Sequence, residues 1–189
     1  MLLAAGAAVD KAMSNMTALG AACVKGNLEC VQLLSSYGAS RIYESVQAEI
    51  IATSRGHTHI SAWLASSRLW NTPLHHLEAV DAARARALLR DGADIHARAE
   101  PDGPTPLSIA HALHAQGAAA RGSAAALVLS AAEPWSPQTH ALFPTASRAR
   151  AVEMLVVGHR LSRESRFEGE SVALCDAWMA AAMPHLVER

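Results

Sequence analysis

The feature that most constrains this fold is a short motif that recurs after 33 residues. The tripeptide Thr-Pro-Leu begins at Thr72 and again at Thr105. A period of this length is typical of repeat proteins, in which a single unit cannot bury its apolar face alone and must stack on a neighbour. We therefore expect part of the chain to be a stack of similar small units.

The residues between the two copies predict a pair of short helices. Thr72 can cap the first helix with its hydroxyl, and the proline that follows suits the first helical position, where a backbone N–H has no intrahelical partner. Asp81 can cap a second helix, and Gly92 supplies the left-handed residue that ends it. The apolar stripe of this second helix consists of Ala85, Leu88 and Leu89. Helices this short are marginal in isolation, so each pair must pack on its neighbours.

This stretch resembles the ankyrin repeat, whose units begin with Thr-Pro-Leu-His, as residues 72–75 do. The resemblance covers residues 1–132 and is clearest over 17–40 and 72–110. It implies an all-α fold, an ankyrin-type solenoid of about four irregular helix-turn-helix repeats with short finger loops. It also implies a concave face, formed by finger loops and first helices, that binds other proteins.

The first two repeats follow the ankyrin pattern unevenly. The first complete repeat spans about residues 12–40, with Thr17 at the capping position. The second has no Thr-Pro-Leu start, and its residues 42–45 predict only a poor finger. Its second half is clear, because residues 52–57 align with the ankyrin turn sequence Ala-Ala-x-x-Gly-His. The expected inner face of the helix that follows consists of Ile60, Trp63 and Leu64.

Irregular connections are expected around the clearest repeat. Only seven residues separate Leu64 from Thr72, which is too few for a standard finger. The residues expected to pack over this gap are Trp63, Leu69 and Trp70. The third repeat lacks the usual Gly-His turn and has lost one residue between its helices. The fourth begins at Thr105, and a small-residue insertion after Gly117 precedes its second helix at residues 124–132.

Beyond residue 132 the repeat signature ends. Prolines or capping residues precede helical periodicity over residues 145–162 and 168–183, and we expect Pro184 to end the second of these helices. Residues 133–189 then form a helical C-terminal extension. We expect it to cap the open face of the last repeat, because a stack needs a terminal unit with a polar outer side.

The first residues of the chain resemble the end of a repeat more than a signal peptide. Residues 2–10 follow the pattern Leu-Leu-x-x-Gly-Ala-x-Val-Asp that closes an ankyrin unit. They lack a basic start, and their apolar part ends quickly at Asp10 and Lys11. We therefore expect the chain to be a fragment, or a truncated gene model, of a longer ankyrin protein.

Composition narrows the class of partner and compartment. Of 189 residues, 51% are hydrophobic but only 4% are aromatic, so alanine and leucine fill the core, as in helical stacks. A formal net charge of −1 provides no long-range field for nucleic acid or an anionic membrane, and we expect neither as a partner. No run approaches the roughly 20 apolar residues of a membrane span. Three cysteines without paired spacing favour an intracellular location, cytoplasmic or nuclear.

Histidines that follow the repeat pattern are expected to be structural. The resemblance implies that His75 bonds the Thr72 hydroxyl and the backbone of a neighbouring repeat, and that His57 helps to pin adjacent loops. His111 and His114 lie at i, i+3 on one predicted helix, a spacing that suits two zinc ligands. No cysteine or carboxylate lies beside them at ligand spacing, so we favour a solvated or packed pair. The sequence predicts no metal and no cofactor.

No nucleophile elbow, phosphate loop or His-Glu-x-x-His motif is present, so we expect the protein not to be an enzyme. A rival hypothesis places a catalytic site in the extension, with His140, His159 and Asp176. Cys23 and Cys30 are expected to be buried small hydrophobes. Several arginines on predicted helices are expected on a solvated outer face, with a basic patch for an acidic partner as the alternative: Arg84, Arg86, Arg90, Arg148 and Arg150.

The expected function is that of a non-catalytic scaffold whose concave face binds another protein. The ankyrin pattern exposes eight candidate contact residues, which are Met13, Ser14, Met16, Lys25, Arg55, Arg98, Glu100 and Asp102. Among these regions, the long finger at residues 98–104 is the first place to expect a partner.

An alternative is an adaptor whose C-terminal helices recruit a second protein, such as a ligase component. The exposure of the C-terminal helices distinguishes an adaptor from a cap. An open apolar face that contains Leu174, Trp178 and Met179 would favour docking of a second protein. Burial of that face against Leu127 and Leu129 would favour a cap.

Overall fold

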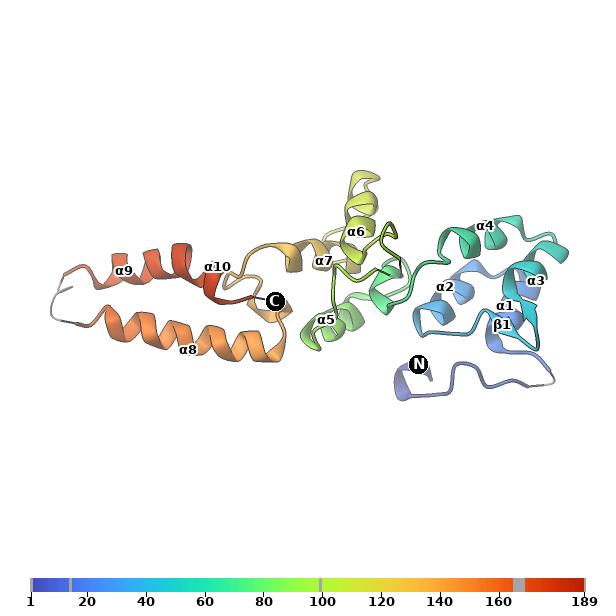
Figure 1. The fold of residues 1–189 in the computed structure, drawn as a ribbon, viewed down its shortest axis with the longest axis horizontal. Coiled ribbons are helices and arrows are strands. Elements are labelled where there is room, and N and C mark those ends of the chain that lie inside the picture. The colour runs from blue at the N-terminus through green and yellow to red at the C-terminus, as the bar shows by residue number, and fades with distance from the viewer. Residues whose placement is uncertain (1, 14, 99, 165–168, 189) are drawn as a thin grey trace.

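The structure is a computed structural model that describes residues 2–13, 15–98, 100–164 and 169–188. The molecule is elongated, with packed helical pairs at one end and a two-helix hairpin at the other (Figure 1). Helices dominate the described residues, which contain only a small two-stranded sheet, β1 with β2. The expected all-α class is therefore confirmed.

The first two helical pairs share one hydrophobic core. Each pair reverses direction at a glycine in the left-handed region, Gly26 with φ 73° and Gly56 with φ 77°. The first pair is α1 (Ala18–Lys25) and α2 (Leu28–Ser36), and the second is α3 (Ala48–Ser54) and α4 (Thr58–Ser66). The Thr17 hydroxyl caps α1 as expected, accepting from the Gly20 N–H at 3.2 Å. The shared core includes Leu19, Cys23, Val31, Ala52, Ile60 and Leu64.

Residues 42–45, expected to form a poor finger, instead form the first strand and the turn of a β-hairpin that spans residues 42–47. Strand β1 (Ile42–Tyr43) pairs antiparallel with β2 (Val46–Gln47). The turn residues Glu44 and Ser45 have φ values of 47° and 70°, the positive region that a two-residue hairpin turn requires. Neither is glycine or asparagine, so turn preferences alone did not indicate the hairpin.

The helix expected after Thr72 is reduced to a single 3₁₀ turn, η2 (Pro73–His75). The earlier pairs have a left-handed glycine just before the cap of the second helix, whereas this pair has Val80 there. The connection between the helices of this pair is one residue shorter than in the earlier pairs and contains no glycine. The first helix therefore cannot end with a left-handed residue as theirs do. The second helix, α5 (Ala82–Arg90), is as expected, because Asp81 accepts from the Arg84 N–H at 2.8 Å and Gly92 adopts φ 85°.

The fourth pair matches its prediction closely. Thr105 caps α6 (Pro106–Ala115) by accepting from the Ser108 N–H at 3.0 Å. Ser123 caps α7 (Ala124–Ala132), and α7 packs against both α6 and α5. A second hydrophobic core results, and its fully buried members include Leu74, Leu89, Ile95, Ala110 and Val128.

The C-terminal extension begins with η3 (His140–Leu142) and α8 (Thr145–Leu161), the latter close to its predicted bounds. The returning arm is α9 (Ser171–Ala177), a π-helical turn at Trp178–Ala182, and α10 (Met183–Leu186). Residues 165–168, part of the predicted loop and helix start, lie outside the described residues. Pro184 lies inside α10 and does not end the helix. The wider π-helical turn just before it fits a residue that has no N–H to donate to the preceding turn.

The extension has a small core of its own, formed by Trp135, Phe143, Ala151, Met183 and Val187. Trp178 packs across to α8, where its indole N–H donates to the Met154 carbonyl at 3.0 Å. The paired helices extend away from α6 and α7 (Figure 1). The expected burial of Trp178 against Leu127 is therefore not observed, since Leu127 belongs to the second core.

The two cores of the stack meet at a junction that is polar and aromatic. Arg84 of α5 donates to the Ser36 hydroxyl at 2.9 Å and to the Ser36 carbonyl at 2.7 Å, and its guanidinium lies 3.5 Å from the centre of the Tyr37 ring. The expectation of a solvated outer face is wrong for Arg84, which instead satisfies the C-terminal end of α2. Arg86, on the same helix, is exposed as expected.

Replacing Arg84 with lysine should weaken this junction. A lysine cannot supply the planar two-donor fork or the same stacking on Tyr37, so we expect the free energy of unfolding to fall by about 1–2 kcal/mol. Arg86→Lys is the matched control and should leave it unchanged. Urea denaturation of both variants measures the difference, and equal stabilities would contradict the role of Arg84.

Candidate partner-binding face

Exposed apolar side chains gather on the first two fingers and the helix that follows them. Met13 is 82% exposed, and Ile42 and Ile50 are each 58% exposed. We call the set the finger patch, which consists of Met13, Met16, Ile42, Val46 and Ile50. Met13 and Met16 come from the first finger, Ile42 and Val46 from the β-hairpin, and Ile50 from α3.

Contacts between the first two repeats bring the parts of the finger patch together. The Ser40 N–H donates to the Asp10 carboxylate at 2.8 Å, which ties the base of the first finger to that of the second. Helices α1 and α3 pack directly against each other. Gly20 of α1 leaves room at this contact, because an added Cβ would lie 3.2 Å from Met16 and 3.9 Å from Ile51.

Seven of the eight residues predicted for this face are exposed around or beyond the finger patch. Lys25 and Arg55 are exposed at the ends of α1 and α3. Arg98, Glu100 and Asp102 are exposed on the loop after α5, where Arg98 donates to the Pro101 carbonyl at 2.8 Å. The sixth and seventh exposed residues are Met13 and Met16.

Met16 is 38% exposed and belongs to the finger patch. The eighth predicted residue, Ser14, lies outside the described residues. The loop that carries the three charged residues is anchored in the second core by Ile95, so the structure groups it apart from the finger patch.

Two histidines join neighbouring helical pairs through backbone carbonyls, as expected. The His75 Nδ1 lies 2.8 Å from the Thr72 hydroxyl, and its Nε2 lies 3.1 Å from the Pro104 carbonyl. Because a carbonyl only accepts, the Nε2 carries the proton and Nδ1 accepts. His57 makes a comparable bond, with its Nε2 3.2 Å from the Val24 carbonyl. These side chains hold backbone in place and are not available to a ligand.

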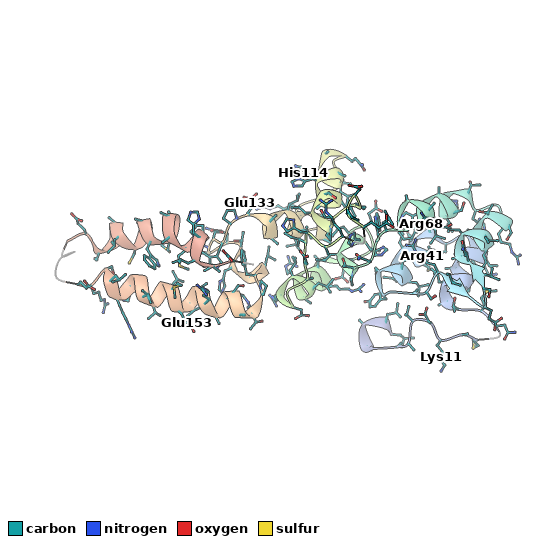
Figure 2. The ribbon with its side chains drawn as sticks, viewed as in Figure 1. Lys11, Arg41, Arg68, His114, Glu133 and Glu153 are labelled. Carbon is teal, nitrogen blue, oxygen red and sulfur yellow. The ribbon has the colours of Figure 1, made fainter. Side chains whose placement is uncertain are left out.

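Arg41 and His76 are structural residues that the sequence analysis missed. Arg41 donates to the carbonyls of Leu64 and Ser67 at 2.7 and 3.1 Å, at the C-terminal end of α4 (Figure 2). His76 is buried, and its ring lies 5.9 Å from Trp63 and 5.1 Å from Trp70. The predicted packing of the two tryptophans is observed, with ring centres 5.8 Å apart.

The surroundings of His76 keep its imidazole neutral. Burial, and then the positive charges of Arg41, His75 and Arg84, lower the pKa of His76 to about 4. Its Nδ1 makes no hydrogen bond to any described residue. Only the three-dimensional packing creates this environment, since nothing in the local sequence distinguishes His76 from an exposed histidine.

No catalytic or metal-binding constellation is found among the described residues. No group of three or more histidine, cysteine or acidic side chains there could hold a metal ion, and His111 and His114 are both exposed. Burial raises the pKa of the Cys23 thiol to about 11, which keeps it protonated and unreactive at neutral pH. Cys23 is buried as expected, whereas Cys30 is exposed, contrary to expectation.

The rival site in the extension is not assembled as a catalytic group. His140 accepts a hydrogen bond from the Trp135 indole at 3.1 Å, which is a packing role. His159 and Asp176 are exposed on α8 and α9. Within the described residues, none of the helices combines the length and apolar character needed to cross a bilayer.

Among the first four helical pairs, the exposed finger patch is the feature that most resembles a binding surface. No protein-family model, curated protein or solved structure matches the chain.

The neutral state of His76 predicts a specific loss of stability in acid. Its pKa is near 6.5 in the unfolded chain and about 4 in the folded protein, so between these values the unfolded state binds more protons. The contribution of neutral His76 to the free energy of unfolding is complete above pH 6.5. It is lost as the pH falls toward 4, a decrease of about 3 kcal/mol in all.

The variant His76→Phe should lack this component, so its free energy of unfolding should fall less than that of the wild type over the same pH range. Urea denaturation at several pH values measures the difference. His111→Gln, at an exposed position, is the control and should follow the wild type. A His76→Phe curve parallel to the wild-type curve would show that His76 titrates normally.

Proposed function

We propose that this chain is an ankyrin-type repeat protein that binds another protein through the finger patch and has no catalytic activity of its own. The observation that carries the proposal is the gathering of exposed Met13, Ile42 and Ile50 on adjacent elements. Single exposed apolar residues are ordinary on protein surfaces, whereas several on adjacent elements are more typical of an interaction site.

The ankyrin assignment is supported by recurring local structure. Thr17 and Thr105 cap the first helices of two pairs. Left-handed glycines reverse the first two pairs, and Gly92 ends the second helix of the third. His75 and His57 join one unit to the next through backbone carbonyls. In this proposal the fingers and first helices form the binding face, and Lys25 and Arg55 are exposed at the far ends of α1 and α3.

A second candidate function has its own observation. The C-terminal hairpin exposes apolar side chains along both helices, among them Val152, Val156 and Val172. Leu174 and Trp178 are half-buried and Met179 is 36% exposed. This arrangement fits the adaptor hypothesis, in which the hairpin recruits a second protein.

Site-specific photo-crosslinking tests the two functions together. A benzoyl-phenylalanine probe replaces Met13, Ile42, Val172 or Glu78 in turn, the last being an exposed control away from both surfaces. We expect a discrete adduct from the probes at Met13 and Ile42. Adducts from Val172 alone would favour the adaptor, and identical adducts from all four positions would contradict a defined interface.

Substitution of the finger patch provides the quantitative test once the crosslinked partner is identified and purified. The triple variant Met13→Ser, Ile42→Ser, Ile50→Ser should weaken binding by about tenfold or more, because a few central anchors carry most of the binding energy of an interface. Its melting temperature should not fall, since all three side chains are exposed. Unchanged affinity would show that the partner binds elsewhere, with Arg98, Glu100 and Asp102 the next positions to change.

A further inference from the structure

The C-terminal hairpin of α8 and α9 projects from the packed helices that precede it (Figure 1). Its own core lies at its base, where Trp135 and Phe143 pack with Ala151 and Met183. Farther from the base, α8 buries only Gly158, and α9 buries none of its residues. The two helices therefore cover each other on one side and leave their other sides open.

Trp178 and Gly158 mark the sides that the two helices turn toward each other. The Trp178 indole N–H donates to the Met154 carbonyl of α8 at 3.0 Å. Its ring lies directly over Gly158, where an added Cβ would be 2.5 Å from a ring carbon. These contacts provide a reference from which the direction of every other side chain on the hairpin can be judged.

Each arm of the hairpin has an exposed apolar stripe. On α8, Val152 is 54% exposed and Val156 is 45% exposed, and the two lie one turn apart on the same face. On the returning arm, Val172 is 74% exposed and Met179 is 36% exposed, and these lie two turns apart. We call these four residues the hairpin face.

The two stripes lie on the same side of the hairpin. At about 100° per residue, each stripe is rotated roughly 100–160° clockwise from the reference residue of its helix, seen from the start of that helix. The references are Gly158 on α8 and Trp178 on the returning arm. Because the two arms are antiparallel and face each other, the same rotation in both points to one common side. The hairpin face is therefore a single apolar surface.

The two arms differ in charge. Helix α8 contains three arginines, Arg148, Arg150 and Arg160, and one acidic residue, Glu153, which gives a net charge of +2. Figure 2 shows Glu153 on the edge of α8 away from α9. The returning arm, α9 to α10, contains Asp176 and neither lysine nor arginine. One arm of the hairpin is thus complementary in charge to the other arm of an identical hairpin.

This complementarity selects one of two ways in which two hairpins can meet face to face. If α8 lay over α8 of the other copy, the two basic helices would repel each other. If α8 lies over α9 of the other copy, each basic helix faces an acidic arm. A two-fold axis along the hairpin produces the second arrangement and keeps every residue at its own level. Met179 lies next to Trp178, which contacts residues 154 and 158, so it is level with Val156.

We propose that the hairpin face binds the same face of a second copy of this chain, so that the two hairpins form an antiparallel four-helix bundle. Val156 of each copy packs against Met179 of the other. The surface is distinct from the finger patch, and the inference does not depend on binding there. It assigns a second copy to the surface where the adaptor hypothesis has a different protein.

Sedimentation velocity of the full chain at about 1–100 µM tests the association. The wild type should approach about twice the mass of one chain as its concentration rises. The double variant Val156→Ser, Val172→Ser should raise the dissociation constant about tenfold or more. The control Val157→Ser, Ala173→Ser changes exposed positions on the opposite side of the same helices and should stay within about twofold of the wild type. Circular dichroism should show equal helix content in all three.

Disulfide formation between unlike chains tests the orientation. In a background of Cys30→Ser and Cys175→Ser, a chain with Val156→Cys is mixed with a chain with Met179→Cys under mild oxidation. The mixture should form a covalent dimer of unlike chains faster than either variant crosslinks alone, because disulfides require closely placed Cβ atoms. A photo-crosslinking probe at Val172 should likewise give an adduct of two copies of this chain.

The proposal is overturned if the wild type stays monomeric over this range or if the two serine variants have equal dissociation constants. It is also overturned if Val156→Cys alone crosslinks as fast as the mixture, since α8 would then lie over α8. The finger-patch triple variant should associate as the wild type does. Failure of these tests therefore leaves binding at the finger patch untouched.

Discussion

The contact between Arg84 and the end of α2 joins the two groups of packed helices that precede the C-terminal extension. On one side lies the core of the first two helical pairs, and on the other the core that α5, α6 and α7 share. Arg84 spans the boundary by bonding Ser36 twice and stacking on Tyr37. A helix C-terminus has unsatisfied carbonyls and a partial negative charge, so a guanidinium there is stabilised by both hydrogen bonding and electrostatics.

Other side chains along the helical pairs also bond backbone carbonyls of neighbouring elements. Arg41 bonds carbonyls at the end of α4, His75 bonds the Pro104 carbonyl, and His57 bonds the Val24 carbonyl. Each bond joins a side chain to backbone outside its own helix. Short helices leave many unsatisfied carbonyls for their length, and side chains from neighbouring helical pairs satisfy some of them. Positions of the finger loops, and hence of the finger patch, follow from these bonds.

Much of the local structure could be predicted from the sequence because its causes are local. Thr17, Asp81, Thr105 and Ser123 cap helices as their positions indicate, and the glycine at 92 ends α5. The wrong predictions have one of two causes. Either the structure depends on residues far apart in the sequence, or a turn forms against the usual residue preferences. The hairpin at residues 42–47 forms despite unfavourable turn residues, and the role of Arg84 depends on a serine 48 positions away.

The candidate surfaces were predictable to different extents for the same reason. Met13 and Met16 were identified from the repeat pattern, but Ile42, Val46 and Ile50 were missed because the second finger departs from that pattern. A cleft of about 520 Å³ could not be recognised from the sequence at all, because its lining residues span positions 92 to 188 and only packing of the extension against α5 and α7 brings them together.

Native-state amide hydrogen exchange tests most directly whether the junction makes the two cores one cooperative stack. If Arg84 and its neighbours couple them, the slowest amides of α2 and α4 should share one opening free energy with those of α5 and α7. Opening free energies that differ by more than about 2 kcal/mol between the two groups would contradict the account, because weakly coupled repeats open independently.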